Sequence, residues 1–131
     1  MSYLKTIYFR DEQGVDDYPQ KLCNYLSQAI YQQSGSLDGK KILDIGSGKG
    51  NHLVGFMRNG MDAYGIDLRD ECLKSAGQEF EINGCDIESE VFPYKDNMFD
   101  FVFSKSVLEH VVNADNFMSQ TYRVLKPGGT V

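Results

Sequence analysis

The chain of 131 residues has few cysteines, no long hydrophobic run and no excess of basic residues. Its three cysteines, Cys23, Cys72 and Cys85, are odd in number and scattered, so they give neither a disulfide framework nor metal-ligand spacing. No segment approaches the roughly 18 apolar residues of a membrane span. The first six residues lack the basic-then-apolar pattern of a secretory signal. These absences predict a cytoplasmic protein with free thiols and no contact with a membrane.

Acidic residues outnumber basic residues by 19 to 13, which gives a net charge of −6. A broad nucleic-acid footprint needs a basic face, so this charge disfavours a nucleic-acid substrate. The length suits one domain. We expect a first part, residues 1–39, that packs on a core formed by residues 40–131.

The sequence of the N-terminal part predicts one helix, from Pro19 to Gln33. Proline suits a first helical position, and apolar residues recur at helical spacing. These residues are Leu22, Tyr25, Leu26, Ala29 and Ile30. The preceding acidic stretch, with Tyr3, Tyr8, Phe9 and Tyr18, is equally consistent with a lid over a ligand and with a solvated tail.

Residues 42–50 carry the most informative pattern. An apolar strand stops at Asp44 and is followed by glycine at alternate positions, Gly46, Gly48 and Gly50. Glycine lets the backbone turn tightly and approach a ligand closely. Such a loop between a strand and a helix holds the polar end of an adenosine cofactor in doubly wound α/β proteins.

Competing interpretations of this loop fit less well. A phosphate-binding P-loop needs Ser or Thr after the lysine, but Gly50 follows Lys49. A dinucleotide fingerprint needs a third glycine where this chain has Asn51. A tight turn without a ligand would be a costly use of three glycines, because each loses extra entropy on folding.

Two later strands also end in carboxylates. Asp67 ends a strand predicted from Met61 and lies 19 residues beyond Gly48, where an acidic residue accepts hydrogen bonds from ribose hydroxyls. Its alternative role is to cap a following helix. Asp86 follows a third strand, within residues 80–85, and its alternative role is that of a turn residue bonded to its own backbone.

A fourth strand is predicted from Phe99 to Ser104 and is followed by Leu-Glu-His-Val at residues 108–111. A helix then ends at the Lys-Pro-Gly-Gly of residues 126–129. From about Lys40 to Val131, the order of these motifs resembles the class I S-adenosylmethionine-dependent methyltransferases that act on small molecules. The resemblance implies a Rossmann-like, doubly wound α/β fold with a mainly parallel sheet.

The resemblance also implies that S-adenosylmethionine is the cofactor. Asp44 and the glycine loop would hold its methionine end, Asp67 its ribose, and Asp86 with Ile87 its adenine. The full set of implied cofactor contacts is Asp44, Gly46, Ser47, Gly48, Gly50, Asp67, Leu68, Asp86, Ile87 and Ser104. Ser104, Glu109 and His110 are candidates for contact with the methyl acceptor. Histidine is the side chain whose unperturbed pKa lies near neutrality, so His110 is the candidate catalytic base; its alternative is a surface or packing role. No metal is expected.

The family fold has seven strands in the order 3-2-1-4-5-7-6. This chain has room for four strands and for the start of a fifth at Thr130 and Val131. We therefore expect a sheet that is incomplete at its C-terminal side. One edge of the Phe99-to-Ser104 strand would be largely unpaired, and such an edge is a template for homo-oligomer formation. The predicted function is methyl transfer to a small molecule. The alternatives are a non-catalytic S-adenosylmethionine-binding fragment or pseudoenzyme, and a nucleotide-dependent oxidoreductase.

Overall fold

A computed structural model of the chain describes residues 18–68, 71–75 and 78–131. Its helices are α2 (Tyr18–Ser34), α3 (Asn51–Arg58) and α4 (Ala114–Val124), with a 3-10 turn η1 (Leu108–His110). Its strands are β1 (Lys41–Ile45), β2 (Asp62–Asp67), β3 (Glu71–Ser75), β4 (Gln78–Gly84), β5 (Phe99–Ser104) and β6 (Leu125–Thr130). The acidic and aromatic stretch before Tyr18, considered as a lid or a tail, lies outside the described residues.

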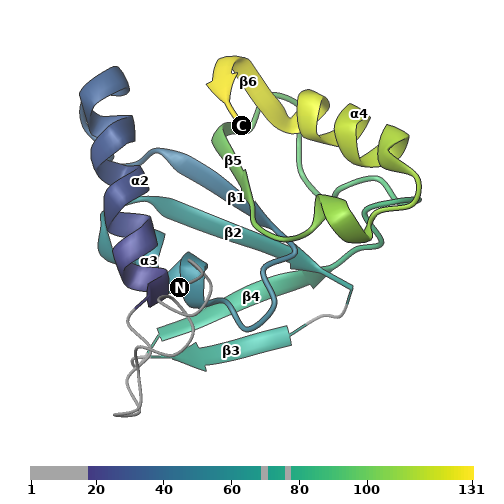
Figure 1. The fold of residues 1–131 in the computed structure, drawn as a ribbon, viewed down its shortest axis with the longest axis horizontal. Coiled ribbons are helices and arrows are strands. Elements are labelled where there is room, and N and C mark those ends of the chain that lie inside the picture. The colour runs from purple at the N-terminus through teal and green to yellow at the C-terminus, as the bar shows by residue number, and fades with distance from the viewer. Residues whose placement is uncertain (1–17, 69–70, 76–77) are drawn as a thin grey trace, which may run out of the picture.

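The strands form one sheet in the order β3-β4-β2-β1-β5-β6 (Figure 1). β1 pairs in parallel with β2 and with β5, and β2 pairs in parallel with β4. β5 pairs in parallel with β6, whereas β3 runs antiparallel to β4. The predicted doubly wound, mainly parallel sheet is confirmed.

Helices cover both faces of the sheet, with α2 and α3 on one side and α4 on the other (Figure 1). Successive side chains of β1 point to opposite faces of the sheet, as the pleat of a strand requires. Ile42 packs with Cys23 and Phe56 on the α2 and α3 side. Leu43 and Ile45 belong to a second core on the α4 side of the sheet. This core also contains Phe92, Phe99, Phe117 and Val124. This layering leaves the carboxyl ends of β1, β2 and β5 for the loops of the site.

One strand was not expected from the sequence. After Asp67, the alternative prediction was a helix capped by that residue, and it is wrong: the next described element is β3. β3 pairs along β4 from Glu71 opposite Ile82 to Ser75 opposite Gln78. This hairpin covers the edge of β4, which would otherwise present unpaired backbone groups.

The C-terminal side also differs from the prediction. α4 ends at Val124 and the chain enters β6 directly, so the strand begins at Leu125 and not at Thr130. Leu125 pairs with Phe99 and Thr130 with Phe101, with an irregularity between them. The expectation that this edge of β5 is unpaired is therefore wrong, because tertiary pairing overrides the weak strand propensity of proline and glycine.

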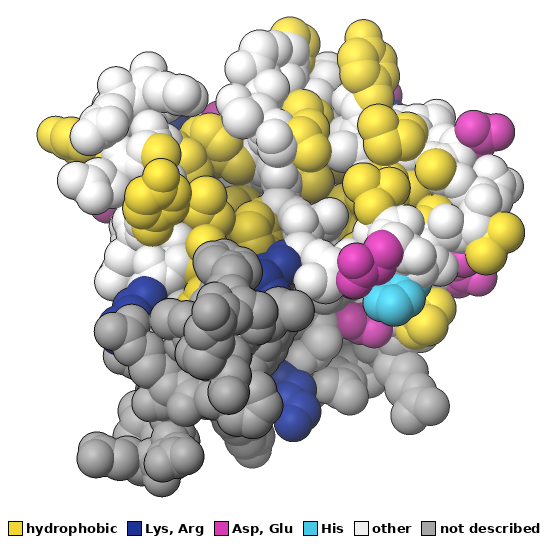
Figure 2. Space-filling view, in the orientation of Figure 1, with side chains coloured by type: hydrophobic (Ala, Val, Ile, Leu, Met, Phe, Trp, Pro, Cys, Tyr) yellow, Lys and Arg dark blue, Asp and Glu magenta, His cyan; other side chains and the backbone are white. Residues whose placement is uncertain are grey.

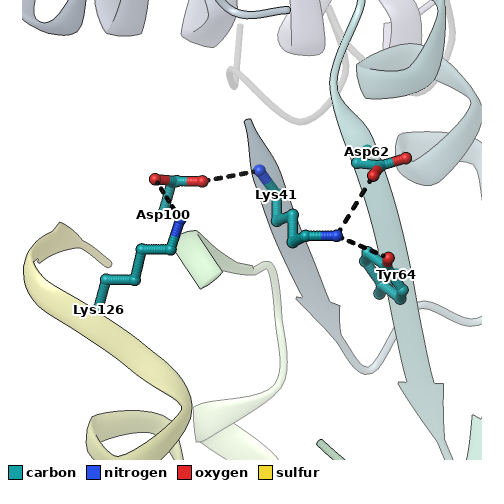
Figure 3. Close-up of polar contacts among 5 residues, drawn as sticks. All are labelled: Lys41, Asp62, Tyr64, Asp100 and Lys126. Atoms are coloured by element: carbon teal, nitrogen blue, oxygen red, sulfur yellow. Dashed lines mark hydrogen bonds and ion pairs between the residues drawn. The ribbon is translucent and has the colours of Figure 1, made fainter. Parts of the chain in front are cut away.

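A polar network fixes the amino ends of four strands (Figure 3). The backbone N–H of Lys41 donates to Asp100 at 2.9 Å, and Lys126 forms an ion pair with the same carboxylate at 3.2 Å. Burial alone would raise the pKa of Asp100, but these two partners lower it overall. The Lys41 ammonium reaches Asp62 at 3.4 Å and Tyr64 at 3.1 Å. β6 is thereby tied to β5 and β1 at the end of the sheet opposite the glycine loop.

Candidate functional site

The loop between β1 and α3 has left-handed backbone angles at each of its alternate glycines, with φ of 74° at Gly46, 53° at Gly48 and 78° at Gly50. Residues with a Cβ rarely adopt this conformation. The N–H groups of Gly46 and Ser47 both donate to the Ile66 carbonyl, at 2.8 and 3.1 Å. The end of β2 therefore holds the loop in place.

The two sides of this loop differ in how much space they leave. A Cβ on Gly46 would collide with the Val107 side chain, whereas a Cβ on Gly48 would meet none of the described residues within 4 Å. Gly46 and Gly48 are both exposed, and Gly46 lines the cavities described below. The loop thus contacts Val107 at Gly46 and has free space around Gly48 within the described part of the chain.

A first cavity of about 240 Å³ lies beside the loop. It is lined by Asp44, Gly46, Ser47, Lys49, Asn51, His52, Phe103 and Lys105. Asp44 is only 2% exposed. Burial, and then repulsion from Asp67, raises the pKa of Asp44 to about 8. A buried carboxylate of this kind favours either a bound proton or a cationic ligand group.

A second cavity of about 300 Å³ shares Gly46 with the first. It is lined by Gly46, Asp67, Leu68, Cys85, Asp86, Ile87, Glu88, Ser106, Val107, His110 and Val111. The Asp67 carboxylate accepts from the N–H of Gly48 at 2.8 Å and from that of Leu68 at 2.7 Å. These bonds hold Asp67 in place on the wall of the second cavity.

The turn after β4 forms one wall of the second cavity. Asp86 accepts a bond from the Glu88 N–H at 3.0 Å, which is the local turn role considered as its alternative. Glu88 in turn accepts from the N–H groups of Val112 and Asn113, both at 2.7 Å. The side chain of Asn116, which belongs to α4, donates to two backbone carbonyls of this turn. The wall is therefore fastened to the segment that follows η1.

His110 lies at the surface of η1. Its Nε2 atom is 3.5 Å from the Glu109 carboxylate, and the side chains of both residues are more than half exposed. Figure 2 shows a histidine side chain at the surface with acidic side chains beside it. His110 lines the cavity of Asp67 and Asp86, not the cavity of Asp44.

The structure thus brings most of the predicted residues to one edge of the sheet. Gly48, Gly50 and Ser104 line neither cavity, although Ser104 lies opposite Ile45 at the end of β5. Sequence reasoning missed Lys49, Asn51, His52, Phe103 and Lys105 in the first cavity and Cys85, Glu88, Ser106, Val107 and Val111 in the second. A signal existed for some of them, since Lys49 and Lys105 each adjoin a predicted site residue.

Within residues 18–68, 71–75 and 78–131, no group of three or more metal-ligating side chains is present. No helix in these same ranges is both long and apolar enough to cross a membrane.

Residues 43–131 match the family described as Methyltransferase domain. The chain is 28% identical to phosphoethanolamine N-methyltransferase 2 of Caenorhabditis elegans, across 96% of this chain and 34% of that protein. It is 34% identical to the mitochondrial ubiquinone biosynthesis O-methyltransferase of Bos taurus, across 79% of this chain and 30% of that protein.

A solved structure of Haemonchus contortus phosphoethanolamine N-methyltransferase 2, in complex with S-adenosyl-L-methionine, has a similar fold. The TM-score is 0.58 at 22% identity, covering 98% of this chain and 34% of that chain. The present chain therefore spans about a third of these relatives' length. It belongs to the methyltransferase domain family, which confirms the resemblance to class I S-adenosylmethionine-dependent methyltransferases.

Proposed function

We propose that this chain binds S-adenosylmethionine and supports methyl transfer to a small-molecule acceptor. The observation that carries the proposal is the loop of three left-handed glycines, open at Gly48 and joined to Asp67 beside a buried Asp44. This arrangement lies at the carboxyl ends of adjacent parallel strands, where ligands bind in open α/β sheets.

The residues present fit the cofactor. The two adjoining cavities have the total size of a ligand pocket. The first cavity offers the Asp44 carboxylate to an ammonium group, and the second offers Asp67 to ribose hydroxyls. Asp86, Ile87 and Leu68 lie along the second cavity. We assign this cavity to the adenosine end, and Asp86 and Ile87 to contact with the adenine. Charge-assisted hydrogen bonds of this kind are stronger than neutral ones.

When bound, the cofactor supplies an activated methyl group. The chain's own contribution is to hold donor and acceptor in line, which is a proximity effect. Gly46, Ser47, Gly48 and Gly50 shape the backbone that faces the methionine end. Ser104 and Glu109 are proposed acceptor contacts, and His110 is a proposed general base. Phosphoethanolamine and precursors of ubiquinone exemplify the chemistry of the relatives' acceptors.

Isothermal titration calorimetry of the 131-residue chain with S-adenosylhomocysteine and, separately, with NAD tests the cofactor assignment. We expect the first to bind and NAD neither to bind nor to compete. Binding of NAD without a response to S-adenosylhomocysteine would favour the nucleotide-dependent oxidoreductase.

Methyl transfer from radiolabelled S-adenosylmethionine to phosphoethanolamine and hydroxylated quinone precursors then tests activity. Cofactor binding without transfer to any acceptor would favour the non-catalytic alternative. If transfer is found, the pH dependence of kcat in His110→Ala tests the general base, and an unchanged profile would remove that role.

A further inference from the structure

Two walls of the second cavity come from distant parts of the chain. One is the turn after β4 (residues 86–90, the turn wall), and the other contains η1 (residues 106–111, the η1 wall). The proposed adenine contacts lie on the turn wall and His110 lies on the η1 wall. The distance between the two walls therefore decides which ligand fits the cavity.

Each wall is held together by its own hydrogen bonds. In the turn wall, the Asp86 carbonyl accepts from the N–H groups of Ser89 and Glu90, at 3.2 and 2.8 Å. The Glu90 carboxylate also accepts from the Asp86 N–H, at 2.9 Å. In the η1 wall, the His110 N–H donates to the Val107 carbonyl at 2.9 Å. Each wall is thus a small unit, and its position relative to the other depends on bonds that join them.

Glu88 supplies such bonds from the turn wall. Its Oε1 atom accepts from the N–H groups of Val112 and Asn113, both at 2.7 Å, and these donors lie 24 and 25 residues further along the chain. Both donors directly follow the η1 wall. Hydrogen bonds to a carboxylate are charge-assisted and stronger than neutral ones. Glu88 is also half-buried and lines the cavity itself.

The start of α4 completes this connection. Asn113 is the N-cap of the helix, and in a capping box a Glu or Gln at the third helical position accepts from the N-cap N–H. Here the third position holds Asn116, whose side chain donates instead to the carbonyls of Ile87 and Glu90, at 2.9 and 2.8 Å. Glu88 accepts from the N-cap N–H in its place. The turn wall and the start of α4 thus satisfy each other's backbone groups.

We propose that Glu88 is a positioning residue that fixes the spacing of the turn wall and the η1 wall, so that the second cavity has its binding shape before a ligand arrives. This inference rests on the proposed function, which assigns the cavity to the adenosine end of the cofactor. Without the carboxylate, the η1 wall is in register with Asp86 for only a fraction of the time. The apparent affinity for a ligand of this cavity then falls by that fraction.

Two substitutions at Glu88 separate its hydrogen bonds from its charge. Glu88→Ala removes the acceptor, whereas Glu88→Gln keeps an acceptor oxygen without the charge. Asp115→Ala is the matched control, because it removes a carboxylate from the first turn of α4 and lines neither cavity. Calorimetry on the 131-residue chain measures the affinity for S-adenosylhomocysteine and for methylthioadenosine. Hydrogen exchange followed by NMR measures the protection of the Val112 and Asn113 amides.

In Glu88→Ala, these two amides should exchange about tenfold faster than in the wild type, because they lose their acceptor. The affinity for both ligands should fall by about tenfold, which corresponds to a binding-competent fraction of about a tenth. Glu88→Gln should stay within about threefold of the wild type in both measurements, because it keeps the hydrogen bonds. Asp115→Ala should change either quantity by less than about twofold, since a charge in the first turn has a small effect on a helix.

Unchanged exchange at both amides in Glu88→Ala would overturn the connection between the walls. Faster exchange with unchanged affinity would overturn its role in shaping the cavity. Losses as large in Glu88→Gln as in Glu88→Ala would assign the effect to charge and would also overturn positioning.

A wild-type chain that binds neither ligand would overturn the proposed function, while the exchange of the two amides would still decide whether Glu88 connects the walls. Thermal unfolding of each variant identifies losses that come from misfolding. If Glu88→Ala does not fold, Asn116→Ala breaks the other half of the same connection and should weaken both ligands in the same direction. Wild-type affinity in a folded Asn116→Ala variant would then overturn the proposal.

Discussion

The carboxylate of Asp67 at the end of β2 accepts a hydrogen bond from the backbone N–H of Gly48, with 2.8 Å between Oδ2 and N. Asp67, the residue proposed to bind the ribose, therefore also orders the loop proposed to hold the methionine end of the cofactor. Asp67 lines the second cavity, so this bond holds its carboxylate in position before a ligand binds. Such preorganisation lowers the entropic cost of binding.

Asp67→Ala should weaken S-adenosylhomocysteine binding by roughly 1.5–3 kcal/mol, the range for a hydrogen bond to a charged group. Calorimetry provides the measurement. Asp62→Ala is the matched control, because Asp62 lies on the same strand at the end away from both cavities. An Asp67→Ala affinity within about twofold of the wild type would limit Asp67 to holding the loop.

Gly48→Val should abolish S-adenosylhomocysteine binding, since its side chain would extend from the open side of the loop. Strain must be separated from this effect, because φ is +53° at Gly48. Gly35→Val is a suitable control: φ is +80° there, and a Cβ would also meet nothing within 4 Å in residues 18–68, 71–75 and 78–131. Each substitution should cost about 1–2 kcal/mol of unfolding free energy. Binding by a folded Gly48→Val variant at wild-type affinity would mean that the loop does not contact the ligand.

Asp44 should make stability depend on pH in the cofactor-free chain. Burial, with repulsion from Asp67 second, raises its pKa from 3.8 to about 8. Between these pH values the folded chain holds a proton that the unfolded chain has lost. The free energy of unfolding therefore falls as the pH rises through this window.

Asp44→Asn cannot ionise and should lose this dependence. Thermal unfolding between about pH 5 and pH 9 should show the variant gaining stability relative to the wild type as the pH rises. A difference between the two proteins that stays constant with pH would contradict the assignment. Ligand binding by the wild type near pH 7 should also release a proton, detected as a dependence of the calorimetric heat on the buffer.

Asp100 should control access to the edge of β5. Asp100→Asn removes the ion pair with Lys126 and should loosen β6, which exposes backbone groups of β5 to another copy of the chain. We expect light scattering across a concentration series to show stronger self-association than in the wild type. Asp96→Asn is a control, because Asp96 pairs with Arg123 and not with β6. An Asp100→Asn variant that stays monomeric at all concentrations would contradict this role.

The sequence alone determined the elements that depend on local patterns. The helix predicted from Pro19 to Gln33 is α2, from Tyr18 to Ser34, and the strand from Phe99 to Ser104 was predicted with the same bounds. The glycine spacing was equally informative, because each glycine of the loop has the left-handed backbone that only glycine adopts easily. Periodicity and backbone permissiveness are properties of neighbouring residues, so they can be read along the chain.

Tertiary structure decided what depends on residues far apart in sequence. β3 and β6 form because β4 and β5 offer unpaired edges, although Pro127, Gly128 and Gly129 are poor strand formers. The raised pKa of Asp44 comes from burial and from Asp67, which lies on another strand. Likewise, Lys49 and Lys105 share one cavity only because β1 and β5 are neighbours in the sheet. Pairing, burial and charge proximity are set by the folded chain, and no local pattern encodes them.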